Sequence, residues 1–212
     1  APARRRMRRW PIVTLDGVNL DGVNPDGVTP EDASPEPAAQ ASASIVLVGP
    51  MGAGKSSIGR RVAKALSLSF IDTDSAIVRE HGPISAIFDE HGEPHFRTLE
   101  RAAVHDALAR GGVVALGGGA VLHPDTQLEL RGHKVVLLLV DASTVASRIR
   151  DDSRPLLRGA TAVEDWERIF QQRRPVYDQV ATITFDTSRG PLQDVVNDIV
   201  EWAREGAEEQ HD

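Results

Sequence analysis

Short runs of apolar residues recur along most of the chain, and longer stretches with a polar face separate them. A short run that is apolar throughout predicts a strand that is buried on both faces of a sheet. The runs at 45–48, 113–116 and 135–140 have this pattern, and those at 68–71 and 182–185, which each contain polar residues, are further strand candidates. Between them, apolar residues recur at helical spacing, as over 97–109 and 191–203. This alternation favours the α/β class, with a three-layer fold in which helices cover a five-stranded parallel sheet and ligands bind beyond the carboxyl ends of its strands.

Residues 1–43 differ from the rest of the chain. They contain five arginines within the first nine positions, then an Asp-Gly-Val repeat of period five, then a stretch rich in Pro, Ala, Ser and Glu. A period of five matches neither a helix nor a strand, and Asp-Gly pairs form turns. We therefore predict a disordered, low-complexity extension at 1–43 and a folded domain at 44–212. The extension could be a basic arm for an acidic partner or a calcium-binding repeat, but the repeat lacks the further acidic ligands that a calcium loop needs.

The composition narrows the class of protein. The chain has 212 residues, 41% of them hydrophobic, which suits one domain with a buried core and a tail. Its net charge of −7 argues against a general nucleic-acid binder. Cysteine is absent, so the chain has no disulfides, thiolate metal sites or cysteine nucleophile. No apolar run approaches the ~20 residues of a membrane span, and no apolar segment follows the N-terminal arginines as in a secretory signal. We expect a cytoplasmic monomer without nucleic-acid or membrane partners.

The most informative motif, at 49–56, reads Gly-Pro-Met-Gly-Ala-Gly-Lys-Ser and fits the pattern G-x-x-x-x-G-K-[ST] in full. Its glycines let backbone N–H groups curl around phosphate oxygens, and the helix that follows directs its positive N-terminus at them. Lys55 is expected to reach the β- and γ-phosphates, and the Ser56 hydroxyl to bind Mg²⁺. The motif predicts a P-loop nucleotide-binding protein, but it leaves GTPases, ATPases, motors and metabolite kinases open.

Two carboxylates follow the second predicted strand. Asp72 and Asp74 are two residues apart, at the edge of the sheet where the phosphate loop is also expected. One of them could hold the water shell of a magnesium ion, and the other could take the proton of a substrate hydroxyl. Alternatively, Asp74 is simply the N-cap of a helix that begins near Ser75.

An arginine and a run of glycines come next along the chain. Arg97 and Glu100 share one face of a helix, so Glu100 can orient Arg97 to grip a carboxylate with both arms of its guanidinium. A solvated surface pair is the alternative. Residues 117–119, which are all glycine, follow the third strand and either allow close approach of the backbone to a ligand or form a flexible loop.

Two further arginine motifs lie near the C-terminal end. Arg154 belongs to a polar segment at about 150–162, which we expect to be a lid that closes over the transferring phosphoryl group. Arg173 and Arg174 precede Pro175 at the expected end of a helix, where basic residues are favourable for the helix dipole alone.

Taken in series, these motifs closely resemble the shikimate kinase family of P-loop small-metabolite kinases. The series is GPMGAGKSSIGR, D-T-D, F-R-x-x-E, GGG, R-P-L-L and R-x-P-x-Y, and the resemblance runs from about residue 44 to about residue 203. It implies an enzyme that uses ATP to phosphorylate the 3-hydroxyl of shikimate, giving shikimate 3-phosphate and ADP on the route to chorismate and the aromatic amino acids. It also implies a moving lid and a substrate-binding subdomain beside the five-stranded sheet.

The resemblance implies roles for single residues as well. Asp74 would bind the shikimate hydroxyls and act as the base, and Asp72 would hold one Mg²⁺ through water beside Ser56. The implied catalytic residues are Lys55, Asp74 and Arg154. The implied shikimate contacts are Asp74, Arg97, Gly118, Gly119 and Arg173. The implied ATP contacts are Gly52, Ala53, Gly54, Lys55, Ser56, Ser57, Arg154 and Arg189, with Arg148 or Arg150 as further candidates for adenine.

Two alternatives remain open at this point. The first is another metabolite kinase of the same fold, such as a gluconate kinase, whose substrate also carries a carboxylate and hydroxyls. The second is a binding or regulatory module that keeps the fold without catalysis. The triple glycine and the D-T-D motif favour shikimate, and the intact Lys55, Ser56, Asp74 and Arg154 favour an enzyme.

Overall fold

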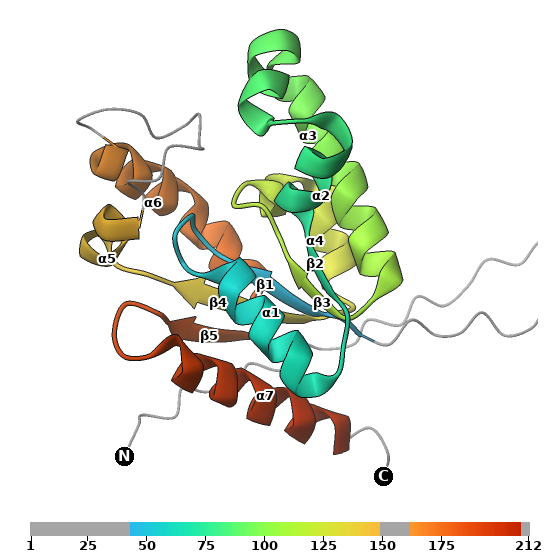
Figure 1. Cartoon of the computed structure of the whole chain (residues 1–212), viewed down its shortest axis with the longest axis vertical. Helices are drawn as coiled ribbons and strands as arrows, with labels where there is room; N and C mark the ends of the chain where they lie inside the picture. Colours follow the sequence, from blue (N-terminus) through green and yellow to red (C-terminus); the bar gives the residue numbers. More distant parts are fainter. Residues whose placement is uncertain (1–42, 149–161, 209–212) are drawn as a thin grey trace, which may run out of the picture. The chain divides into compact units, whose positions relative to one another are not determined.

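The apolar run at 45–48 forms β1 (Ile45–Val48), the central strand of a five-stranded sheet. The computed structural model describes residues 43–148 and 162–208. The sheet order is β2-β3-β1-β4-β5, and all neighbouring strands pair in parallel (Figure 1). The other strands are β2 (Phe70–Asp72), β3 (Val113–Ala115), β4 (Lys134–Leu139) and β5 (Ile183–Asp186). The predicted five-stranded parallel sheet is therefore confirmed.

Helices cover both faces of the sheet. They are α1 (Lys55–Leu66), α2 (Thr73–His81), α3 (Ile84–Arg110), α4 (Pro124–Leu130), α5 (Ala142–Arg148), α6 (Ala162–Val180) and α7 (Leu192–Glu208), with a 3₁₀ turn η1 (Ala120–Leu122). One face packs mainly against α1 and α7, and the other against α3, α4 and the end of α6 (Figure 1). Alternate residues of β1 supply the two cores: Ile45 and Leu47 contribute to the first, Val46 and Val48 to the second. This is why the strand is apolar at every position.

A third, smaller apolar cluster lies apart from the two faces of the sheet. It joins α2 to α3 through Ile77, Ile87 and Phe96. The helix α3 is bent at Gly92, whose backbone is non-helical with φ 78° and ψ 172°, and Pro94 follows in the first turn of the second half, where its missing N–H is harmless. In Figure 1 the first half of α3 extends away from the sheet, so this cluster is the core of the predicted substrate-binding subdomain.

The structure corrects several predicted boundaries. The second strand is Phe70–Asp72 rather than 68–71, and Leu68 is exposed, because the chain first makes a turn at Ser67 with positive φ. The boundaries of the last three strands shift by about one residue, whereas β1 is as predicted, and the last helix extends to Glu208. The predicted extension at 1–43 lies outside the described residues except for Ala43, and the predicted lid lies outside them except for Ala162.

The prediction that a helix ends at Arg173 and Arg174 was wrong. The helix α6 continues through Pro175 to Val180, although an interior proline removes one hydrogen bond and costs about 3 kcal/mol. Burial of Tyr177 and the packing of Val180 on the core beneath the sheet offset that cost. Arg173 therefore lies within a helix rather than at its end, and the helix dipole does not explain it.

No helix within the described part of the chain combines the length and the apolar character that crossing a membrane requires.

Candidate active site

The phosphate loop lies between β1 and α1 and depends on glycine at both ends. Gly49 has φ 135°, and a Cβ built there would lie 2.2 Å from the carbonyl oxygen of Leu138 in the neighbouring strand. Gly54 caps α1 in a left-handed conformation, with φ 86° and ψ 14°. Residues that carry a side chain rarely adopt such backbone angles, so these two positions require glycine. The resulting curl brings the loop to the N-terminus of α1, where anions are favoured.

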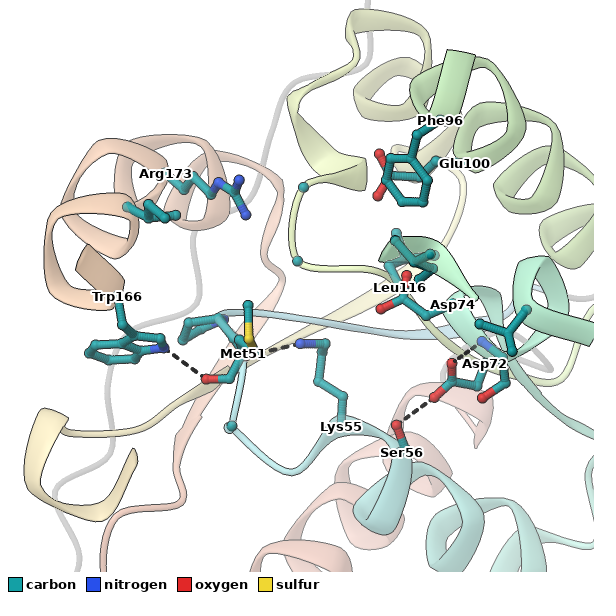
Figure 2. A pocket seen from close by; sticks show the side chains of 18 of the residues that line it. Met51, Lys55, Ser56, Asp72, Asp74, Phe96, Glu100, Leu116, Trp166 and Arg173 are labelled. Carbon is teal, nitrogen blue, oxygen red and sulfur yellow. Dashed lines mark hydrogen bonds between the residues drawn. The ribbon is translucent and has the colours of Figure 1, made fainter. Parts of the chain in front are cut away.

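The lysine of the loop is held by the loop itself. The Lys55 Nζ donates to the carbonyl oxygens of Gly49 and Pro50, at 2.8 and 2.9 Å. Figure 2 shows its side chain crossing the opening of the loop. These contacts keep the ammonium group over the position that the motif assigns to phosphate.

Ser56 and Asp72 meet where the loop faces β2. The Ser56 hydroxyl donates to Asp72 Oδ2, and Asp72 Oδ1 accepts from the backbone N–H of Ser75 at 2.9 Å (Figure 2). Asp72 is therefore the N-cap of α2. The alternative that Asp74 caps this helix is wrong, because Asp74 is the second residue of α2. The cap leaves Asp74 to point into the cavity, toward the side of the loop that carries Lys55 (Figure 2).

Gly117, the first of the three glycines, packs against two carboxylates. A Cβ built there would lie 2.5 Å from Asp74 Oδ1 and 2.9 Å from Glu100 Oε1. The fully buried Thr73 ties this loop to α2: its hydroxyl accepts from the Gly117 N–H at 3.0 Å and lies 3.4 Å from the Ala115 carbonyl oxygen. The glycine run was expected to let a ligand come close to the backbone. At Gly117, the groups that come close are instead side chains of the protein itself.

We predict that Gly117→Ala lowers kcat/KM for the phosphoryl acceptor by about 100-fold, because the added methyl displaces Asp74 and small misplacements of reacting groups have effects of that size. Nucleotide affinity should stay within a few-fold of wild type. The matched control is Gly132→Ala, where the nearest atom to the new Cβ is 3.8 Å away and steady-state kinetics should be unchanged. Equal effects of both substitutions would contradict the steric explanation.

Arg97 is held in place by two glutamates. It donates to Glu100 Oε2 at 2.7 Å, and to Glu93 Oε1 at 3.2 and 2.8 Å from Nε and NH2. Burial by itself lowers the pKa of Arg97, but the two carboxylates outweigh burial and the net pKa is raised. Burial raises the pKa of Glu100, with Asp74 adding to this effect and the two arginines, Arg97 and Arg173, opposing it. Glu100 is 4% exposed, so the solvated surface pair is excluded.

The remaining glycines bring both arginines to one loop. A Cβ on Gly119 would lie 2.5 Å from Arg97 NH1, and a Cβ on Gly118 would lie 3.6 Å from Arg173 NH1. Figure 2 shows Arg173 on α6 and Glu100 on α3 pointing into the cavity from opposite sides. Two guanidinium groups from different helices therefore converge on the glycine loop, and such a pair suits a carboxylate.

Two aromatic residues on α6 were not anticipated from the sequence. The Trp166 indole N–H donates to the Met51 carbonyl in the phosphate loop at 2.9 Å (Figure 2). The Tyr177 hydroxyl donates to the Gly118 carbonyl at 2.5 Å. Burial raises the pKa of Tyr177 to about 12, against the lowering effect of Arg173. Tyr177 is part of the R-x-P-x-Y motif, but nothing in the sequence indicates which backbone group either residue binds.

A cavity of ≈ 840 Å³ joins these groups. The predicted site residues that line it are Gly52, Gly54, Lys55, Ser56, Ser57, Asp72, Asp74, Arg97, Gly118, Gly119 and Arg173. Two others do not line it: Ala53 is buried within the phosphate loop, and Arg189 is exposed in the turn before α7. Arg150 and Arg154 lie outside the described residues, as does the side chain of Arg148.

A nucleotide-binding loop, a carboxylate and two converging arginines around one cavity define a P-loop kinase for a small anionic metabolite. Comparison with known proteins identifies the family within this class of kinases. The shikimate kinase family model matches residues 51–204. A shikimate kinase from Rhodococcus erythropolis is 44% identical over 159 residues, which cover 73% of this chain and 94% of the relative. The chain belongs to the shikimate kinase family.

Solved structures agree with this assignment. The shikimate kinase from Acinetobacter baumannii, solved in complex with shikimate, matches with a TM-score of 0.74 and 34% identity over 80% of this chain and 97% of its own. A gluconokinase from Sinorhizobium meliloti shares the fold, with a TM-score of 0.56 and 24% identity over 81% of this chain and 99% of its own. The predicted class of enzyme, an ATP-dependent kinase for shikimate, is confirmed through the family, which disfavours both the gluconate kinase and the non-catalytic module.

Proposed function

We propose that this chain transfers the γ-phosphoryl group of ATP to the 3-hydroxyl of shikimate at the cavity between the phosphate loop and α3, with Asp74 as the base. The new bond joins the hydroxyl oxygen to phosphorus, the bond from phosphorus to the β-phosphate oxygen breaks, and the hydroxyl proton passes to Asp74. The observation that carries the proposal is that Lys55, Asp74 and two arginines line one cavity, although they come from separate elements.

Lys55 and Asp74 supply the two halves of the reaction. Phosphoryl transfer needs little covalent chemistry from a protein, so positioning and neutralisation of charge carry most of the rate. Lys55 exchanges its carbonyl contacts for phosphate oxygens, which are stronger partners because they are charged. Asp74 lies in the first turn of α2, packed against Gly117, so that its carboxylate has a fixed position from which to accept a proton.

The carboxylate of shikimate fits the two arginines. Arg97 is pre-oriented by Glu100 and Glu93, and Arg173 reaches the same loop from α6. We assign the substrate carboxylate to these two groups and the ring to the backbone of Gly118 and Gly119. The related Acinetobacter baumannii enzyme was solved with shikimate bound, which supports a shikimate site in this fold.

We propose that one magnesium ion binds beside Ser56. The hydroxyl of Ser56 and the carboxylate of Asp72 are already in direct contact, and an oxygen-only donor set of this kind fits Mg²⁺, which keeps several waters and uses few protein ligands. When bound, the ion neutralises charge on the phosphates. Asp72 holds the Ser56 hydroxyl in position and, as the cap of α2, fixes the helix that carries Asp74.

Other assignments rest on the resemblance. We assign ATP contacts to residues 52–57 and to Arg189, and the lid function to 150–162 with Arg154. A cytoplasmic monomer with a separate extension at 1–43 remains our expectation for the whole chain.

The test is a coupled assay of ADP release with ATP and Mg²⁺. Shikimate should support turnover with a kcat of the order of 1–100 s⁻¹, as is typical of kinases, whereas gluconate should not. Mass spectrometry of the product should show one added phosphate. Turnover with gluconate alone, or tight binding of shikimate without ADP release, would overturn the proposal.

A further inference from the structure

The single tyrosine of the chain connects α6 to the glycine loop. Tyr177 is 1% exposed, and its hydroxyl donates to the Gly118 carbonyl oxygen at 2.5 Å. Arg173 lies close by, since its positive charge opposes the rise that burial causes in the pKa of Tyr177. The proton of the hydroxyl is directed at Gly118, in the loop of the proposed shikimate site.

The relative positions of Arg173 and Tyr177 follow from the geometry of α6. Arg173 and Tyr177 are four residues apart and share one face of α6. A Cβ on Gly118 would lie 3.6 Å from Arg173 NH1 and 3.8 Å from the Tyr177 hydroxyl. The phenol thus lies beside the arginine and against the loop, where it can restrict both.

The bond to Gly118 also fixes the next backbone amide. A peptide unit is planar and trans, so its C=O and the N–H of the following residue point in opposite directions. Gly118 and Gly119 are both glycine, which leaves the peptide between them little intrinsic preference for one orientation. With the Gly118 carbonyl held toward α6, the Gly119 N–H points away from α6.

We propose that Tyr177 is a positioning residue for shikimate, which orients Arg173 for the substrate carboxylate and the Gly118–Gly119 peptide for the substrate ring. The inference rests on the proposed function, because it needs shikimate to bind at Arg173 and the glycine loop. It adds a residue that does not itself touch the substrate.

The test is Tyr177→Phe, which removes the hydroxyl and keeps the buried ring. KM for shikimate should rise about 10-fold, the effect of one lost hydrogen bond that leaves a buried partner unpaired. KM for ATP should stay within about twofold of wild type, since Lys55 and its loop are untouched. A purely structural role would move both constants together.

The matched control is Trp166→Phe, which removes the other aromatic hydrogen bond from the same helix to a loop. Its indole N–H binds the Met51 carbonyl in the phosphate loop, so KM for ATP rather than for shikimate should rise. Parallel increases of both KM values in both variants would mean that α6 is merely loosened, and would overturn the inference.

A second measurement needs no variant. Because Tyr177 is the only tyrosine, wild-type enzyme with ¹³C-labelled tyrosine rings gives NMR signals from this residue alone. Saturation with shikimate should shift them more than saturation with ADP does, and the reverse order would overturn the inference. A wild-type enzyme that fails to turn over shikimate would contradict the proposed function instead. Normal wild-type turnover with an unchanged shikimate KM in Tyr177→Phe would overturn the role of Tyr177 alone.

Discussion

Replacement of Lys55 by alanine is expected to lower kcat at least about 10³-fold, the scale of losing a cation or donor aimed at a transferring group. The structure shows how the lysine is held in position. The ammonium group is already placed over the opening of the phosphate loop by two carbonyl oxygens, so its charge reaches the phosphates without a search through rotamers. Steady-state ADP release at saturating ATP and shikimate measures the effect.

The matched control for this prediction lies on the same helix. Lys64 is exposed in the last turn of α1, and Lys64→Ala should leave kcat within about twofold of wild type. The circular dichroism spectra of both variants should match that of the wild type, because Lys55 is only partly buried. Near-normal turnover in Lys55→Ala would remove the proposed role of the lysine.

Replacement of Asp74 by asparagine should lower kcat by about 10³-fold, within the range found for removal of a general base. The amide has nearly the same shape, so it can keep its place against Gly117 but cannot accept the hydroxyl proton. The dissociation constant of ATP should change by no more than a few-fold, because the phosphate loop is intact. Single-turnover kinetics together with a nucleotide titration separate the two effects.

An equivalent aspartate serves as the control. Asp125 is also the second residue of a helix, α4, but its side chain is exposed. The change Asp125→Asn removes the same charge from the same helical position and should leave kcat unaltered. If Asp74→Asn retained the wild-type kcat, another group would have to take the proton.

The phosphate loop and the five parallel strands could be predicted because the signals are local. The strands β1, β3 and β4 are apolar at nearly every position, and the glycines of the loop follow β1 directly. Lys55, Asp74 and Arg97 could be nominated for the same reason, since each belongs to a short motif that follows a strand or lies on one of the helices after it. Parallel strands then bring these motifs to one edge.

The remaining features depend on tertiary contacts that have no local pattern. Asp72 and Asp74 are equally good caps by composition, and only the actual start of α2 decides between them. The end of α6 was predicted wrongly because the prediction used only the local effect of Pro175. The burial of Tyr177, which stabilises the helix beyond that proline, is not visible in the sequence. The hydrogen bond from Tyr177 to Gly118 joins residues 59 positions apart in the sequence, and no rule of residue spacing predicts a contact over such a separation.

The strand order also bears on how proteins with this fold can come to accept different substrates. The segment between β2 and β3, which carries α2 and α3, lies on one side of β1, whereas α5 and the turn before α7 follow strands on the other side. It contains Asp74 and Arg97, with Arg173 as their counterpart on α6. Insertions or substitutions within this segment can therefore change which alcohol is accepted and leave the phosphate loop unchanged.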